Sequence, residues 1–162
     1  MDDSSEALLR ELADREAIRD LARAYAHHVW RRDIRAIAEL FAPDGEMDTP
    51  DLAPLVGREA IVEAYEKMLN DDEFHPFVHN HVIELDGDSA TGTCYLDLRA
   101  TINGRQMLSS GWYDDRYQRV DGEWKFGSRK VTMLEFVPIR PRQRGQSGEP
   151  SSAPSAADQR GE

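Results

Sequence analysis

Three histidines lie close together where a run of alternating residues begins: His75, His79 and His81. An unperturbed imidazole titrates near neutral pH, so it can take up a proton and return it within one reaction cycle. Steps of four and two would place all three on one face of a regular strand. We expect His75 or His79 to be a general base in a pocket; the alternative is a partly exposed histidine at a sheet edge. No fitted fourth ligand accompanies the three, so the signal for metal is weak and we expect no metal site.

An acidic residue lies in the next alternating segment, where Asp97 stands between Leu96 and Leu98. A carboxylate among buried apolar neighbours is costly unless it is exposed or paired. Asp97 is therefore a candidate for orienting His75 or His79 from the neighbouring strand. The competing interpretation is an exposed carboxylate on the outer face of the sheet, opposite a basic side chain or a partner subunit.

Two aromatic side chains complete this set of candidates. The Tyr25 hydroxyl can donate to a developing oxyanion or hold a catalytic water, but Tyr25 also fits an apolar helix stripe, and both interpretations stay open. Trp30 follows five residues later. Because an indole only donates hydrogen bonds, we expect Trp30 to be a cavity wall that stacks on a flat substrate rather than an acid or a base.

The first half of the chain has the periodicity of helices. Apolar residues recur at helical steps at Ile18, Leu21, Ala22, Tyr25, Ala26 and Val29. Asp14 can cap this helix, and a weaker apolar pattern before it would continue the same helix towards the N-terminus. Asp33 can cap a short second helix that carries Phe41 on its inward face and stops at Pro43-Asp44-Gly45. The apolar pattern of residues 57–69 predicts a third helix.

After Phe74 the period of the apolar residues changes to two. The alternating segments lie near 77–85, 89–101, 105–120 and 124–136, separated by Asp86-Gly87, Asn103-Gly104 and Asp121-Gly122. Such dipeptides favour the positive φ angles of tight hairpins. The pattern predicts a meander of four long antiparallel strands, with a short strand near 46–49 that can join the sheet. Helices followed by a meander indicate an α+β fold with the helices on one sheet face.

Length and composition restrict the function classes. The chain has 162 residues, which fits one domain, and a net charge of −11. This charge disfavours nucleic acid and anionic membrane surfaces as partners, since phosphate binding relies on clustered Lys and Arg. No apolar run approaches the ~20 residues of a membrane span, and the acidic start differs from a secretory signal, so we expect a cytoplasmic protein.

Two further observations concern Cys94 and the C-terminal segment. Cys94 is the only cysteine, which excludes an internal disulfide, and its simplest interpretation is a small buried hydrophobe. After Pro138 the composition shifts to Pro, Ser, Gly, Gln and Arg, which cannot bury enough surface to offset chain entropy. We expect one domain over residues 1–139 and a disordered, dispensable tail over residues 140–162.

Four segments together resemble a known protein family. They are DREAIRDLARAYAHHV (14–29), LFAPDGEM (40–47), NHVIELDGDSATG (80–92) and GWYDDRYQRVDGEWKF (111–126). In this order and spacing they resemble the SnoaL-like branch of the nuclear transport factor two-like superfamily. The resemblance implies a cone-shaped α+β barrel, in which three helices pack on a curved, mainly antiparallel sheet. It also implies an apolar cavity where reactions proceed without a cofactor.

The resemblance also suggests roles for individual residues. Dehydratases and dehydrochlorinases of this superfamily use a histidine at the entry of the first long strand, and some orient it with an aspartate on the first helix. Trp30 occupies the position of that aspartate here, and a one-residue shift matches the histidine to His75. Asn80 and His81 follow on the same strand and are expected to bind substrate. Arg129 matches a family arginine that can fix a carboxylate or enolate oxygen; the alternative is a surface ion pair.

These observations lead to one preferred function and two alternatives. The preferred function is a cofactor-independent lyase, isomerase or cyclase that acts on a hydrophobic, ring-bearing small molecule of polyketide, terpenoid or steroid type. The alternatives are a ligand-binding protein with the same cavity and an accessory subunit that builds oligomers. We expect a homodimer or homotrimer through the outer sheet face, with Tyr113, Asp115 and Tyr117 as packing and interface groups.

Overall fold

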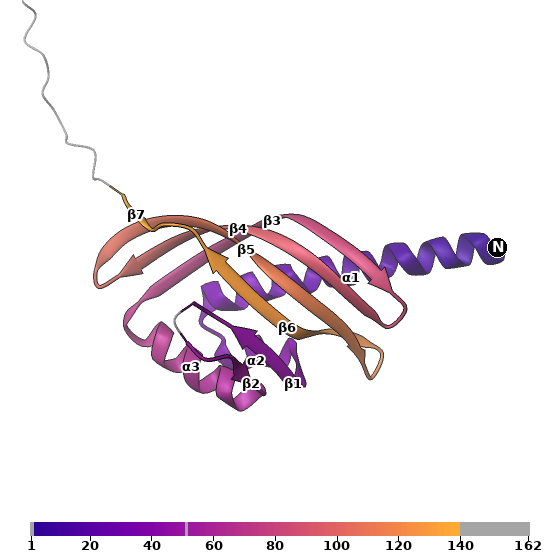
Figure 1. The fold of residues 1–162 in the computed structure, drawn as a ribbon, viewed down its shortest axis with the longest axis horizontal. Helices are drawn as coiled ribbons and strands as arrows, with labels where there is room; N and C mark the ends of the chain where they lie inside the picture. Colours follow the sequence, from indigo (N-terminus) through magenta and orange to yellow (C-terminus); the bar gives the residue numbers. More distant parts are fainter. Residues whose placement is uncertain (1, 51, 140–162) are drawn as a thin grey trace, which may run out of the picture.

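A long first helix lies along one face of a twisted, curved sheet in the computed structural model, which describes residues 2–50 and 52–139 (Figure 1). The helices are α1 (Asp3–Arg31), α2 (Ile34–Glu39) and α3 (Arg58–Asp71). The strands are β1 (Phe41–Asp48), β2 (Leu55–Val56), β3 (Glu73–Asp86), β4 (Ser89–Ile102), β5 (Arg105–Val120), β6 (Glu123–Met133) and β7 (Val137–Pro138). The tail expected over residues 140–162 lies outside the described residues. None of the described helices is both long and apolar enough to cross a membrane.

The seven strands form one mixed sheet in the order β2-β1-β6-β5-β4-β3, and β7 pairs with β5. β3, β4, β5 and β6 pair in sequence as an antiparallel meander, whereas β1 joins β6 in parallel. Positive φ angles at Gly87 and at the Asn103-Gly104 and Asp121-Gly122 pairs close the three hairpins. The predicted α+β architecture, its four long strands and its helix-covered sheet are therefore confirmed, with an open sheet.

The start of α1 differs from the expected one. The Asp2 carboxylate accepts from the Ser5 backbone N–H at 2.8 Å, so the helix begins at Asp3 and Asp14 does not cap it. Asp14 instead accepts from the Arg119 guanidinium at 2.8 Å and from the Trp124 indole at 3.1 Å. The prediction that Asp14 caps the helix was wrong. A short acidic side chain can accept hydrogen bonds from a helix N-terminus, but it can equally accept them from side chains of a distant hairpin, as here. Figure 1 shows that the first turns of α1 extend past the β3–β4 hairpin.

The second helix begins as predicted and ends earlier. Asp33 caps α2 by accepting from the Ala36 N–H at 3.2 Å. The helix stops at Glu39, and Phe41 already belongs to β1, so Pro43-Asp44-Gly45 lies within that strand rather than ending the helix. The cause is pairing in the sheet: the Phe126 N–H donates to the Leu40 carbonyl at 2.9 Å, beside the β1–β6 ladder.

A bulge divides β3 into two parts of opposite orientation. The ladder with β4 shifts between His79 and His81, and Asn80 lies there with a φ of 49°. Two residues of one strand then oppose one of the other, which reverses the side-chain alternation. Before the bulge the inner residues are Phe74, Pro76 and Val78, and after it they include Ile83. The expectation that the three histidines share a face was therefore wrong.

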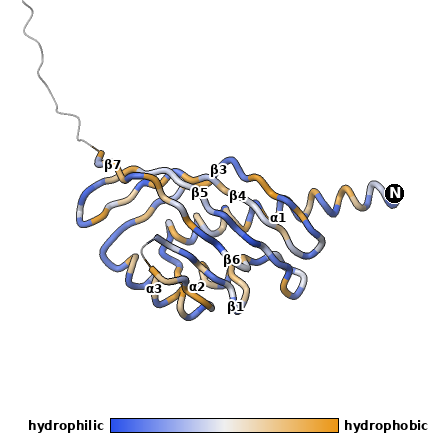
Figure 2. The backbone as a smooth tube through the Cα atoms, viewed as in Figure 1, coloured by the Kyte–Doolittle hydropathy of each residue, from blue (hydrophilic) through white to orange (hydrophobic). Residues whose placement is uncertain are grey.

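The inner face of the sheet and the helices form the hydrophobic core. Figure 2 shows hydrophobic and hydrophilic residues alternating along the strands, as expected when one face is covered. Ile18, Ile37 and Phe126 are fully buried in this core. Cys94 is also buried and free, in agreement with its interpretation as a small hydrophobe, and burial raises the pKa of its thiol to about 11.

Candidate active site

An apolar cavity of about 490 Å³ lies between α1, α3 and the inner face of the sheet. Its buried walls include Met47 from β1, Leu96 from β4 and Tyr113 from β5. Its mouth is lined by exposed side chains such as Leu52, which comes after β1 in the sequence, and Leu134, which comes after β6. Within residues 2–50 and 52–139, no histidine, acid, lysine or arginine lines this cavity. The cavity therefore suits an uncharged, largely apolar ligand.

Three phenols, Tyr25, Tyr65 and Tyr113, line the cavity, and two of them form a hydrogen-bonded pair. The Tyr25 hydroxyl on α1 and the Tyr65 hydroxyl on α3 are hydrogen-bonded to each other, and both side chains are buried. Burial raises the pKa of both hydroxyls above the ordinary value, and for Tyr65 the neighbouring Tyr25 adds to this effect. Both phenols therefore stay protonated at neutral pH. They can donate a hydrogen bond to an oxygen of a ligand.

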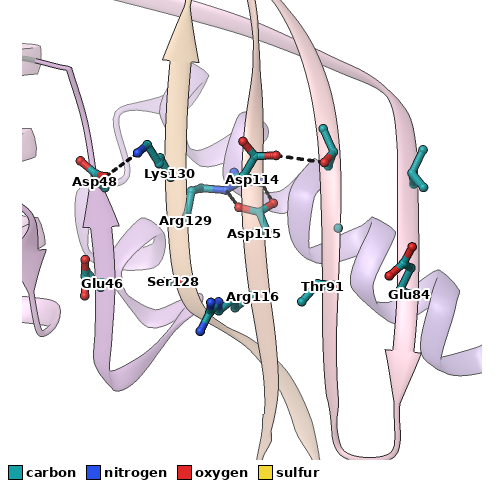
Figure 3. Close-up of a pocket in the computed structure, with 13 residues that line it drawn as sticks. Glu46, Asp48, Glu84, Thr91, Asp114, Asp115, Arg116, Ser128, Arg129 and Lys130 are labelled. Carbon is teal, nitrogen blue, oxygen red and sulfur yellow. Dashed lines mark hydrogen bonds and ion pairs between the residues drawn. The ribbon is translucent and has the colours of Figure 1, made fainter.

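Arg129 is fully buried behind the cavity wall and is not among the residues that line it. Its Nε and Nη2 atoms donate to the two carboxylate oxygens of Asp115, each at 2.8 Å (Figure 3). Its guanidinium carbon lies 4.4 Å from the Tyr25 ring centroid and 3.9 Å from that of Tyr113. Burial alone would lower the pKa of Arg129, but Asp115 reverses this and raises it. Arg129 therefore forms a buried ion pair with Asp115. It forms neither of the expected interactions, a contact with substrate in the cavity or an ion pair at the surface.

A hydrogen-bond chain continues from Asp115 towards β3. The Tyr117 hydroxyl donates to Asp115 at 2.7 Å and lies 2.8 Å from His81 Nε2. Since the Tyr117 proton is directed at Asp115, the network assigns the His81 proton to Nε2, which donates to Tyr117. Burial lowers the pKa of His81 to about 4, so the ring is neutral at pH 7. His81 therefore supports the buried pair rather than the cavity.

His79 and Asp97 do come together, but on the outer face of the sheet. His79 Nε2 lies 3.4 Å from the Asp97 carboxylate, and the two side chains are 45% and 62% exposed. The Ser110 hydroxyl also donates to Asp97, at 2.6 Å. The sheet separates this pair from the apolar cavity. Asn80 is exposed at the bulge and does not line the cavity either.

Trp30 lies at the edge of the sheet rather than in the cavity wall. Its indole Nε1 donates to the Pro76 carbonyl at 2.7 Å. Its ring lies 4.3 Å from the His75 ring, centroid to centroid, and meets the Phe77 ring edge-on at 5.2 Å. His75 precedes Pro76, which does face the cavity, so the alternation of β3 directs His75 away from it. Neither Trp30 nor His75 is among the residues that line the cavity.

A second hollow, of about 620 Å³, lies mainly over the outer face of β1, β6, β5 and β4. Figure 3 shows that charged side chains surround it, among them Glu46, Asp48, Glu84, Asp114, Arg116 and Lys130. Lys130 lies 3.6 Å from Asp48. Because its charges are solvated and partly paired, this hollow does not suit an apolar ring compound.

Sequence reasoning named Tyr25 among the cavity residues and missed its partner. Tyr65 was part of the predicted third helix, and its signal was a phenol in an otherwise aliphatic stripe. Asp115 was expected at an interface, and is instead 3% exposed inside the domain. Its signal was the alternation with Tyr113 and Tyr117, which places an acid on the inner face, where only a buried cation can balance it.

The comparisons with known proteins establish the family. A sequence model described as the SnoaL-like domain matches residues 10–130. The chain belongs to the SnoaL-like family. An uncharacterized protein of Mycobacterium tuberculosis strain H37Rv is 25% identical over 135 residues, which cover 80% of this chain and 92% of that protein.

Two solved structures extend the comparison of this SnoaL-like domain. LinA is 25% identical with a TM-score of 0.76, and the match covers 81% of this chain and 92% of that one. The hexachlorocyclohexane dehydrochlorinase LinA-type3 of Novosphingobium barchaimii is 24% identical with a TM-score of 0.75, covering 81% and 93%. Both are similar in fold and belong to the nuclear transport factor two-like superfamily, which confirms the expected superfamily.

The buried ion pair of this SnoaL-like domain predicts strongly coupled mutations. Arg129→Met leaves the Asp115 carboxylate buried without its cation, which should lower the free energy of unfolding by about 3–5 kcal/mol. Adding Asp115→Leu removes that stranded charge, so the double variant should lose less than the two single variants combined, by about 2 kcal/mol. Urea unfolding at equilibrium measures all three. Additive losses would contradict a mutually dependent pair.

The position of His81 predicts a pH effect on stability. Its pKa is about 4 in the folded protein and 6.5 in the unfolded chain, so the unfolded chain binds more protons between these values. Stability contributed by neutral His81 is then present above pH 6.5 and is lost as the pH falls towards 4. His81→Gln should flatten the urea midpoint between pH 7 and pH 4.5 relative to wild type. An NMR titration that placed the His81 pKa near 6.5 would contradict this assignment.

Proposed function

We propose that the protein is a cofactor-independent lyase, isomerase or cyclase that acts by proton transfer on an apolar, ring-bearing small molecule of polyketide, terpenoid or steroid type. The observation that carries this proposal is the Tyr25–Tyr65 hydroxyl pair in a cavity whose other lining residues are apolar apart from Thr49 and Tyr113. Its volume of about 490 Å³ accommodates a fused-ring molecule. Membership of the SnoaL-like family and similarity to LinA, whose type-3 form is named a dehydrochlorinase, support the same reaction class.

The phenol pair would supply the hydrogen-bond donor of the reaction, and in a dehydration the departing hydroxyl of the substrate would take up the α-proton and leave as water. A carbonyl or hydroxyl oxygen of the substrate would accept from Tyr25 or Tyr65 and gain negative charge in the transition state. A fixed donor in a dry site stabilises such charge more than water does. Arg129 would act as a positioning residue, because it contacts the Tyr25 ring and is held by Asp115. We therefore assign the catalytic role to Tyr25 and Tyr65 and give structural roles to His75, Trp30 and the His79–Asp97 pair.

A second candidate function is binding without chemistry. One observation favours it: in the part of the chain that the structure describes, no imidazole or carboxylate lines the cavity to accept the substrate's proton. In a purely binding site the same phenols would anchor an oxygen of the ligand. The two functions differ in one measurable respect, since only the enzyme releases product.

The test is an assay of enone formation. Cyclic β-hydroxy ketones lose an α-proton and the hydroxyl group as water, and β,γ-unsaturated ketones shift their double bond; both give a conjugated enone that absorbs in the ultraviolet. Tyr65→Phe should lower kcat by about 10²–10³-fold, the usual loss for one oxyanion donor, while binding changes by less than tenfold. His79→Ala, on the outer face, is the matched control and should keep wild-type turnover.

Each outcome of this assay separates the two functions. A large loss in His79→Ala with little change in Tyr65→Phe would contradict the phenol mechanism and favour a histidine base. Tight binding of these ketones without any enone product would favour the binding protein. Absence of both binding and turnover would contradict the proposed use of the cavity.

We also propose a homodimer or homotrimer through the outer sheet face. Large apolar side chains there are unusually exposed: Phe77 at 42%, Tyr95 at 43% and Leu108 at 44%. Phe77 and Leu108 line one hollow, and exposed apolar patches mark interaction surfaces. Light scattering at micromolar concentration should give a multiple of the chain mass, and Tyr95→Glu should reduce it. A monomeric mass for wild type would contradict the proposal.

A further inference from the structure

One polar atom of the cavity wall has no role in the network described so far. Thr49 follows β1 and lines the same cavity as Tyr25 and Tyr65. Its Oγ1 atom is buried and has no hydrogen-bond partner among residues 2–50 and 52–139. A buried hydroxyl without a partner is costly, so native proteins rarely keep one without a reason. Rotation about the Cα–Cβ bond of threonine exchanges hydroxyl and methyl, which can turn Oγ1 towards a ligand.

Thr49 lies in a different part of the cavity from the phenol pair. Tyr25 and Tyr65 are both 3% exposed and belong to the buried end. Thr49 is half-buried and is close in sequence to Leu52, an exposed residue of the mouth. Apart from Tyr113, a phenol of β5, the other residues that line the cavity are apolar. A ligand that fills the cavity can therefore meet one polar group at its inner end and another nearer the mouth.

The charge balance around the cavity determines the ligand's charge. The nearest buried cation, Arg129, is paired in bidentate fashion with Asp115, and the pair is neutral overall. No charged side chain of the described residues lines the cavity itself. A carboxylate bound there would lose its hydration without gaining a counterion, which is strongly unfavourable.

We propose that the cavity takes an uncharged ring compound with two oxygen functions. One oxygen accepts from the Tyr25–Tyr65 pair, and the second forms a hydrogen bond with Thr49 Oγ1. Acidic ring compounds of the same shape are rejected. This inference names the substrate class of the proposed site and depends on the proposed function only for the use of this cavity and its phenol pair.

Four probes of matched shape test the proposal by isothermal titration calorimetry. They are 2-acetylnaphthalene, its 6-hydroxy and 7-hydroxy derivatives, and 2-naphthoate. At least one hydroxylated ketone should bind wild type about three- to tenfold more tightly than the parent ketone, as one neutral hydrogen bond provides. The naphthoate should bind at least about 100-fold more weakly than the parent ketone, because its charge would be buried unpaired.

Two variants of Thr49 attribute the effect to its hydroxyl. Thr49→Val keeps the shape of the side chain and should abolish the advantage of the hydroxylated ketone without changing the affinity of the parent. Thr49→Ser keeps the hydroxyl and should preserve the advantage. Neither change should lower the urea midpoint, since Oγ1 has no partner to lose, and Thr49→Val should raise it because the unpaired hydroxyl is removed.

The outcomes distinguish this inference from the function on which it rests. An advantage that persists in Thr49→Val, or equal binding of the ketones and the naphthoate, would overturn the inference while leaving the cavity as the binding site. Equal binding of all the ketones to wild type would also overturn the role of Thr49. Failure of every probe to bind would overturn both the inference and the proposed use of the cavity.

Discussion

The site depends on one buried interaction, the bidentate ion pair between Arg129 and Asp115. Both side chains are 0% exposed, and the two residues are register partners on β6 and β5. A buried charge is tolerated only when its partner is fixed in good geometry, and here the carboxylate receives two bonds from Arg129 and one from Tyr117. The guanidinium in turn contacts the rings of Tyr25 and Tyr113, which form part of the cavity wall. The pair thus fixes the cavity wall and leaves the cavity electrically neutral.

Local signals made most of the fold predictable. The apolar stripe of α1, the Asp33 cap and the three hairpin dipeptides each act through neighbours in sequence, so the periodicity located the elements. The errors arose where a residue distant in sequence determines the role of a side chain. Asp14 is bound by Arg119 and Trp124 from another part of the chain, and no local rule reveals such a bond.

The candidate site was less predictable, and the bulge at Asn80 is the main reason. His79 faces outward before the bulge, and a single extra residue in β3 then reverses the alternation, so that His81 faces inward. Arg129 presented a different difficulty: the family resemblance suggested that it points into the cavity, but its role depends on which acid faces it. Tyr25 and Tyr65 lie on different helices and forty residues apart in sequence; periodicity predicts the apolar stripe of each helix but not the contact between the two.

The position of Trp30 affects how this molecule meets other copies of itself. β3 is the last strand in the sheet order, and the free edge of such a strand can recruit a strand from another molecule. Pro76 has no backbone N–H that could donate to a neighbouring strand, and its carbonyl already accepts a hydrogen bond from the indole of Trp30. Growth of the sheet is therefore blocked at this point by a missing donor and an engaged acceptor. The Trp30 side chain thereby helps to protect the protein against edge-to-edge aggregation.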